Sequence, residues 1–181
     1  MDRSVESKLK HRKNRQKQKN RNMIKLIIFL FLLVIFIVML INSFLFTVVT
    51  VDGDSMQRTL FDGDRLLVKK IGINKDDINI DDLIYFKGND KKYYLKRVVA
   101  LPGDVVEIVN SRLIINGVEK TEDYTRGDAT QAYDKNKWIL KDDEFFVLGD
   151  NRYKNTSVDS RAFGPVKIET IEGKVIRKLK R

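Results

Sequence analysis

Serine and lysine are the residues of this chain that could supply a nucleophile and a base. The only histidine, His11, lies in a basic tail, and the sequence contains no cysteine. A Ser-His-Asp triad needs an imidazole, a cysteine protease needs a thiol, and a structural zinc site needs Cys or His ligands. We therefore expect no metal and no cofactor. A serine paired with a lysine base remains possible, and the candidates are Ser55 and Lys96.

The residue alternation around Lys96 predicts a strand with two distinct faces. One face carries Tyr94, Lys96, Val98 and Ala100, and the other carries Leu95, Arg97, Val99 and Leu101. A lysine in a strand is most often a solvated edge residue, and a serine after Gly53-Asp54 is most often only a turn former. If Lys96 is a base, burial must lower its pKa from about 10.4 toward roughly 7–8, so its pocket should be dry.

The net charge of +10 is distributed unevenly along the chain. Residues 1–25 carry ten Lys/Arg and two acidic residues, which leaves a net charge of only +2 for residues 26–181. The basic excess directly precedes an apolar run, and no basic face interleaved with aromatic residues accompanies it. It therefore indicates an orientation signal and contact with anionic phospholipid, and it argues against nucleic-acid binding.

A membrane-length apolar run follows the basic tail. Every residue from Leu26 to Ile41 is apolar, and residues 23–46 are long enough to cross a hydrocarbon core of about 30 Å. A cleaved secretory signal would need small residues at its end, but the first alanine is Ala100. The sequence thus predicts a cytoplasmic tail over residues 1–22, a transmembrane anchor over 23–46 and an extracytoplasmic domain over 47–181.

Beyond the apolar run, short β-type segments alternate with turn signals, and no helical period of useful length is present. Residues 105–117 predict a hairpin followed by another tight turn. Residues 119–137 are polar and lack periodicity, which indicates a loop on the β core. The fold class we predict is an all-β catalytic domain of short antiparallel strands preceded by one transmembrane helix.

Four segments carry more information than strands and turns require. They are residues 53–60 (GDSMQRTL), 63–68 (GDRLLV), 94–104 (YLKRVVALPGD) and 145–152 (FFVLGDNR), the last leading to 157–161 (SVDSR). Together and in this order they resemble type I signal peptidases, the bacterial membrane-anchored Ser/Lys endopeptidases. The resemblance covers residues 51–164 and implies a signal-peptidase-like β fold.

The resemblance implies a role for each matched residue. Ser55 would be the nucleophile and Lys96 the general base. Ser157 would hydrogen-bond Lys96, while Asp159 and Arg161 would form a nearby ion pair. Substrate contacts would involve Met56, Tyr94 and Leu95.

Three features depart from the usual pattern of the family. Some members have a hydroxyl two residues before the nucleophile, where this chain has Gly53, so the Ser55 backbone N–H would hold the oxyanion without it. Arg58 replaces the usual proline, which removes a fixed φ from the bend. Residues 153–156 stand where two residues are common.

The function implied by the resemblance is cleavage of signal peptides from secretory preproteins at the outer face of the cytoplasmic membrane. An extended preprotein segment would lie beside a strand near Ser55 and Lys96, with small side chains in shallow pockets. Two alternatives remain open from the sequence. One is a related Ser/Lys self-cleaving regulator, and the other is a catalytically silent membrane-anchored β-domain that acts as a binding module.

Overall fold

The computed structural model describes residues 3–70, 72–127 and 129–179, and the chain divides into two compact units, residues 1–43 and 44–181. Helix α1 (Arg3–Leu45) makes up the described part of the first unit. Its last two residues, Phe44 and Leu45, belong to the second unit. Within α1, the segment Lys17–Ile41 has a mean hydropathy of 3.4 and is long enough to cross a membrane. It begins six residues before the predicted anchor, which started at Met23.

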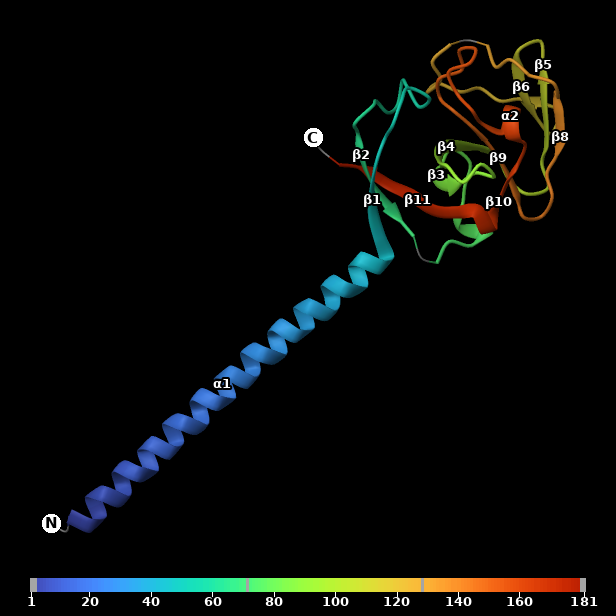
Figure 1. Ribbon diagram of the computed structural model, residues 1–181. Coiled ribbons are helices and arrows are strands. Elements are labelled where there is room, and N and C mark those ends of the chain that lie inside the picture. Colours follow the sequence, from blue (N-terminus) through green and yellow to red (C-terminus); the bar gives the residue numbers. More distant parts are fainter. Residues whose placement is uncertain (1–2, 71, 128, 180–181) are drawn as a thin grey trace. The chain divides into compact units, whose positions relative to one another are not determined.

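The second unit consists mainly of antiparallel strands, so the predicted all-β fold is confirmed (Figure 1). The strands are β1 (Phe46–Thr50), β2 (Arg65–Lys69), β3 (Leu83–Lys87), β4 (Tyr93–Ala100), β5 (Val105–Val109), β6 (Arg112–Ile115), β7 (Val118–Glu119), β8 (Lys137–Ile139), β9 (Glu144–Leu148), β10 (Val166–Lys167) and β11 (Ile171–Lys178). Seven form one sheet in the order β1-β2-β11-β3-β4-β9-β10. The other four form a smaller sheet in the order β7-β6-β5-β8.

Short helical segments interrupt the strands. They are α2 (Ser160–Phe163), η1 (Lys75–Asp77) and η2 (Ile168–Thr170). The hairpin predicted over residues 105–117 is present as β5 paired with β6. The predicted loop is slightly too long at both ends, because Glu119 closes β7 and Lys137 opens β8; the strands leave only residues 120–136 between them.

The predicted two-faced pattern of β4 is wrong beyond Val98. The pairing of β4 with β9 shifts register between Val98 and Ala100. Val99 and Ala100 therefore both pack into the apolar cluster around Trp138, and Leu101 returns to the cluster that contains Val98. A bulge inserts one extra residue into a strand and moves the following side chains to the opposite face. Lys96 precedes the bulge, so its position on the Tyr94 face is unaffected.

Candidate active site

Ser55 lies in the loop that joins β1 to β2. The Val51 N–H donates to Asp64 O at 2.8 Å, which closes the base of this loop. Gly53 has a φ of +82°, in the left-handed region that glycine adopts without a steric penalty, and its N–H donates to Asp62 Oδ1 at 2.8 Å. The Gly-Asp turn that precedes Ser55 is therefore fixed by the backbone.

The segment after β9 holds the Ser55 loop from the other side. The Asn151 N–H donates to Ser55 O at 3.0 Å, and Asn151 Nδ2 donates to Asp54 O at 3.1 Å. Within residues 3–70, 72–127 and 129–179, no hydrogen bond uses the Ser55 N–H. Two carbonyls of the turn are thus engaged, while the amide remains available to an incoming oxygen.

Gly149 marks the closest approach of these two segments. A Cβ at this position would lie 2.3 Å from Ser157 Oγ and 2.6 Å from Ser55 O. Both distances are shorter than real side chains tolerate, so a residue with a side chain would displace the serine turn. Gly149 was part of the matched motif, but its spacing alone gave no reason for a glycine.

Lys96 reaches Ser55 from β4. Its Nζ lies 2.8 Å from Ser55 Oγ and donates to Leu95 O at 3.0 Å. Lys96 is only 3% exposed, and its Nζ lies 5.8 Å from the centre of the Tyr94 ring. The structure therefore brings the two residues together, and it shields the Lys96 amine from water, as a lysine that acts as a general base requires.

The environment changes the pKa of Lys96 in the direction that this chemistry needs. Burial lowers its pKa from 10.5 to about 8, because desolvation disfavours the ammonium form. The carboxylates of Asp159 and Asp150 oppose this shift, and the charge of Arg161 reinforces it. A substantial fraction of the amine is consequently neutral near physiological pH.

Ser157 and Asp159 lie in the segment that leads to α2. The Ser157 hydroxyl donates to Asp159 Oδ2 at 2.7 Å, whereas the sequence predicted a bond to Lys96. In the described part of the chain, the two hydrogen bonds of Lys96 go to Ser55 and Leu95. Ser157 is therefore linked to the carboxylate beside the site instead of directly to the amine.

The ion pair between Asp159 and Arg161 is present and bidentate. Arg161 Nε donates to Asp159 Oδ1 at 2.8 Å and Nη2 donates to Oδ2 at 2.7 Å. Both side chains are almost fully buried, at 0% and 1% exposed. Burial favours the neutral carboxyl, but the hydrogen bonds and charge of Arg161 outweigh it and lower the pKa of Asp159.

This buried pair predicts a large loss of stability when one partner is removed. Asp159→Asn leaves the Arg161 charge buried without its counter-ion and should cost about 3–5 kcal/mol of unfolding free energy. Glu119→Gln breaks the exposed Arg112–Glu119 pair and should cost less than about 1 kcal/mol. Urea unfolding of both variants measures the difference, and similar losses would contradict it.

Two further buried ion pairs surround the site, and the sequence did not indicate either of them. Arg97 Nε and Nη2 donate to Asp150 at 2.8 and 2.6 Å. Arg152 pairs with Glu122 at 2.6 Å and donates to Gly149 O at 2.8 Å. The basic residues and Asp150 lie in the matched motifs, but nothing in the sequence points to Glu122, which comes from the loop over residues 120–136.

A cleft of about 460 Å³ opens in front of Ser55 and Lys96. Met56, Tyr94 and Leu95, which were expected to contact substrate, all line it. Met56 is only 1% exposed, so most of its side chain packs in the apolar cluster beneath the serine turn and not in the cleft. The remaining lining residues are Val49, Thr50, Val51, Asp52, Gly53, Asp54, Tyr85, Tyr93, Thr156 and Val158.

The residues that depart from the family pattern fit the site without displacing it. Thr156 N–H donates to Tyr153 O at 3.3 Å, so the longer segment closes as a turn, and Ser157 after it stays 4% exposed. The Leu60 N–H donates to Met56 O at 2.8 Å, which closes the bend that contains Arg58. The bend is thus maintained by hydrogen bonds where a proline would fix it by its ring.

Known proteins match this chain over most of its length. Residues 21–179 match the family described as signal peptidase, peptidase S26. The chain is 37% identical over 134 residues to signal peptidase I P of Bacillus subtilis subsp. natto, covering 69% of this chain and 71% of that protein. The chain belongs to the signal peptidase family. It is a type I signal peptidase, and enzymes of this type are serine endopeptidases.

Two further signal peptidases are similar to this chain to different extents. Signal peptidase I of Bacillus caldolyticus is 38% identical over 151 residues, covering 77% of this chain and 82% of that protein. A crystal structure of a signal peptidase I from Enterococcus faecalis V583 has 32% identity and a TM-score of 0.44, over 55% of this chain and 97% of that chain. The family assignment supports a peptidase that cleaves signal peptides, in preference to a self-cleaving regulator.

Proposed function

We propose that Ser55 and Lys96 form the catalytic dyad of this signal peptidase, which acts on secretory preproteins at the outer face of the cytoplasmic membrane. The observation that carries the proposal is the 2.8 Å distance between Lys96 Nζ and Ser55 Oγ, with the amine shielded from water. A serine hydroxyl is a weak nucleophile, and a neutral amine at this distance can activate it.

The proposed reaction proceeds through an acyl-enzyme. Ser55 Oγ attacks the scissile carbonyl carbon as Lys96 Nζ takes the hydroxyl proton. The Ser55 N–H stabilises the oxyanion, and Lys96 then returns the proton to the leaving amine as the C–N bond breaks. Lys96 then takes a proton from a water molecule as the water oxygen adds to the acyl carbon. The bond from this carbon to Ser55 Oγ breaks, and Lys96 returns the proton to Oγ, which restores the hydroxyl and releases the acid.

The supporting residues keep the amine in position for these proton transfers. The bond from Lys96 Nζ to Leu95 O fixes the amine between the carbonyl and the serine hydroxyl. The Asp159–Arg161 pair and Ser157 act on the dyad from the neighbouring segment and are positioning residues. Small substrate side chains would enter the cleft beside Met56 and Leu95.

Membrane attachment through α1 completes the proposal. The apolar side chains from Met23 to Ile41 are exposed, and an apolar helix of this length is stable in a bilayer but not in water. The basic residues before it favour a cytoplasmic N-terminus in contact with anionic phospholipid, and the β domain would then lie on the outer side.

The proposed topology predicts a specific digestion pattern. Protease added to intact spheroplasts should digest the β domain and spare a tag fused before Met1, because the membrane shields only the cytoplasmic side. Lysed spheroplasts provide the control in which the tag is also lost. A spared β domain with a digested tag would place the active site in the cytoplasm and contradict the proposal.

The activity itself is tested with the purified full-length chain in detergent and a preprotein substrate. We expect one cleavage, located by mass spectrometry at the junction of signal peptide and mature protein. Heat-inactivated protein controls for contaminating proteases when it is mixed with the same substrate. A folded chain that binds the preprotein without cutting it would instead support the silent binding module.

A further inference from the structure

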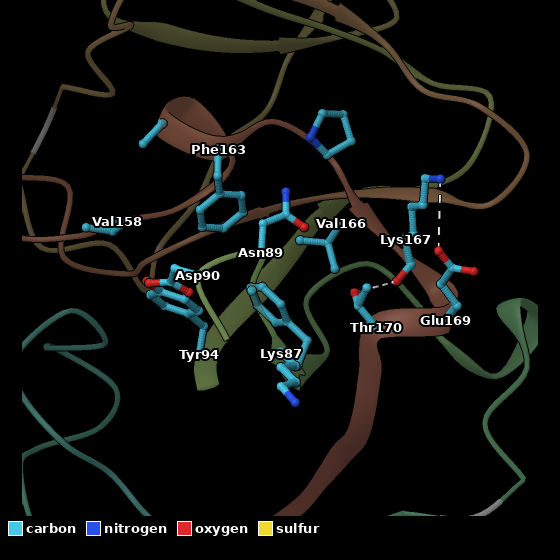
Figure 2. A pocket seen from close by; sticks show the side chains of 14 residues that line it. Lys87, Asn89, Asp90, Tyr94, Val158, Phe163, Val166, Lys167, Glu169 and Thr170 are labelled. Carbon is cyan, nitrogen blue, oxygen red and sulfur yellow. Dashed lines mark hydrogen bonds and ion pairs between the residues drawn. The ribbon is translucent and has the colours of Figure 1, made fainter. Parts of the chain in front are cut away.

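A second cavity, of about 600 Å³, lies beside the active-site cleft. Figure 2 shows the side chains that line it. Its apolar walls come from Phe86 of β3, Tyr94 of β4, Phe163 of α2 and Val166 of β10. Figure 2 shows Phe163 extending from α2 toward Tyr94. The proposed reaction makes no use of this cavity.

Three aromatic rings form a fixed wall of the cavity. The ring centres of Phe86, Tyr94 and Phe163 are separated pairwise by 5.8 to 5.9 Å. The Tyr94 hydroxyl donates to Asp90 at 2.8 Å, which holds the ring from its polar end. A Cβ on Gly88 would lie 2.7 Å from the Tyr94 ring, so the glycine allows the ring to occupy this place. The cavity is thus a preformed feature of the fold.

The cavity adjoins the active-site cleft. Tyr94 and Val158 line both the cavity and the cleft. The ring of Tyr94 lies 5.8 Å from Lys96 Nζ on one side and forms a cavity wall on the other. An extended peptide advances about 3.3 Å per residue. A peptide that reacts at Ser55 and extends past Tyr94 would therefore reach the cavity within a few residues of the scissile bond.

The chemistry of the cavity favours an uncharged, apolar occupant. The charged residues at its rim are two basic and two acidic ones, Lys87, Lys167, Asp90 and Glu169. Lys167 lies 4.0 Å from Glu169, and Asp90 is engaged by Tyr94. A charged side chain would find no complementary excess there, whereas a large apolar side chain would remove aromatic surface from water.

We infer that this cavity is a further substrate subsite, which takes a large apolar side chain of the preprotein within a few residues of the scissile bond. The inference rests on the proposed function, because it needs the peptide to react at Ser55. The enzyme would then select its substrates by two features, namely small side chains in the cleft and one large apolar side chain in the cavity. Phenylalanine and leucine have the size and polarity that the cavity accommodates.

A peptide series tests the inference. Fluorescent peptides spanning a cleavage site carry alanine or phenylalanine at each of the four positions on either side of the scissile bond. Their Kd is measured on the full-length Ser55→Ala variant, and kcat/KM on the wild type. Phenylalanine at one position should lower Kd and raise kcat/KM, each by about tenfold or more, because burying such a side chain typically contributes this much free energy.

Filling the cavity should remove this preference. Ala162 is exposed and lines the cavity, so Ala162→Trp places an indole in it without removing a buried group. The ratio of kcat/KM for the phenylalanine peptide to kcat/KM for the alanine peptide should then fall to about 1. Ile139 is 70% exposed and lies in the smaller sheet, so Ile139→Trp should leave the ratio unchanged. A ratio within one variant is insensitive to the amount of folded protein.

The two readouts separate this inference from the proposed function. Cleavage and binding of the alanine peptides without a phenylalanine preference at any position would overturn the subsite and leave the peptidase proposal intact. A preference that survives Ala162→Trp would also overturn it. A phenylalanine preference in binding with no cleavage of any peptide by wild type would contradict the dyad, and it would reduce the cavity to a binding site that is not a substrate subsite.

Discussion

Ser55→Ala, Lys96→Ala and Lys96→Arg should each reduce preprotein cleavage by about 10⁴-fold or more, because a dyad acts as a unit and neither member functions alone. Alanine at position 55 removes the attacking oxygen. Arginine at position 96 stays protonated and cannot accept the Ser55 proton. Single-turnover cleavage of a purified preprotein measures the loss.

The matched control for these substitutions is Lys141→Arg, on an exposed residue that lines neither the cleft nor the cavity beside it. It makes the same side-chain exchange as Lys96→Arg and should keep near wild-type turnover. Circular dichroism of each variant checks that the β domain remains folded. Turnover close to wild type in any of the three dyad variants would refute the assignment of Ser55 and Lys96.

Activity should rise with pH through the pKa of Lys96, which burial lowers to about 8. Only the neutral amine accepts the serine proton, so kcat/KM should fall about tenfold for each pH unit below this value. Ser157→Ala should slow turnover, because it removes the hydrogen bond that holds the Asp159 carboxylate beside the site. The midpoint of the pH profile should stay similar, because the Ser157 hydroxyl does not bond to Lys96. A flat profile from about pH 6 to 10 would exclude Lys96 as the titrating base.

The same pKa shift makes the stability of the domain depend on pH. Folded Lys96 has a pKa of about 8 and the unfolded residue about 10.5, so between these values the unfolded chain binds more protons. The free energy of unfolding should therefore increase as pH rises through this window, and the full penalty applies below it. Lys96→Met removes the penalty, on the order of 3 kcal/mol at pH 7. Urea unfolding of wild type and Lys96→Met should show a difference that shrinks toward pH 10.5.

The sequence determined the features that depend on local pattern. Short runs of β-branched and aromatic residues between turn residues predicted the antiparallel strands and the β5–β6 hairpin. The apolar run from Leu26 to Ile41 predicted a long helix. The four motifs in their order indicated Ser55 and Lys96, because residue types and their spacing within a motif are read directly from the sequence without knowledge of the fold.

The tertiary structure decided what depends on contacts between distant segments. The bulge between Val98 and Ala100 arises from pairing with β9, which the alternation within β4 cannot report. The partner of Ser157 depends on where Asp159 lies once Arg161 holds it.

Glu122 and the cavity beside Tyr94 show the same limit. Glu122 pairs with Arg152 across 30 positions of sequence, and no local pattern marks either as a partner of the other. The cavity forms because Phe163 and Val166 return from the end of the chain to cover Phe86 and Tyr94. Residue type and spacing thus identified the reacting groups, while burial, pKa and the partners of the supporting charges arose only from packing, since each depends on which distant side chains exclude water.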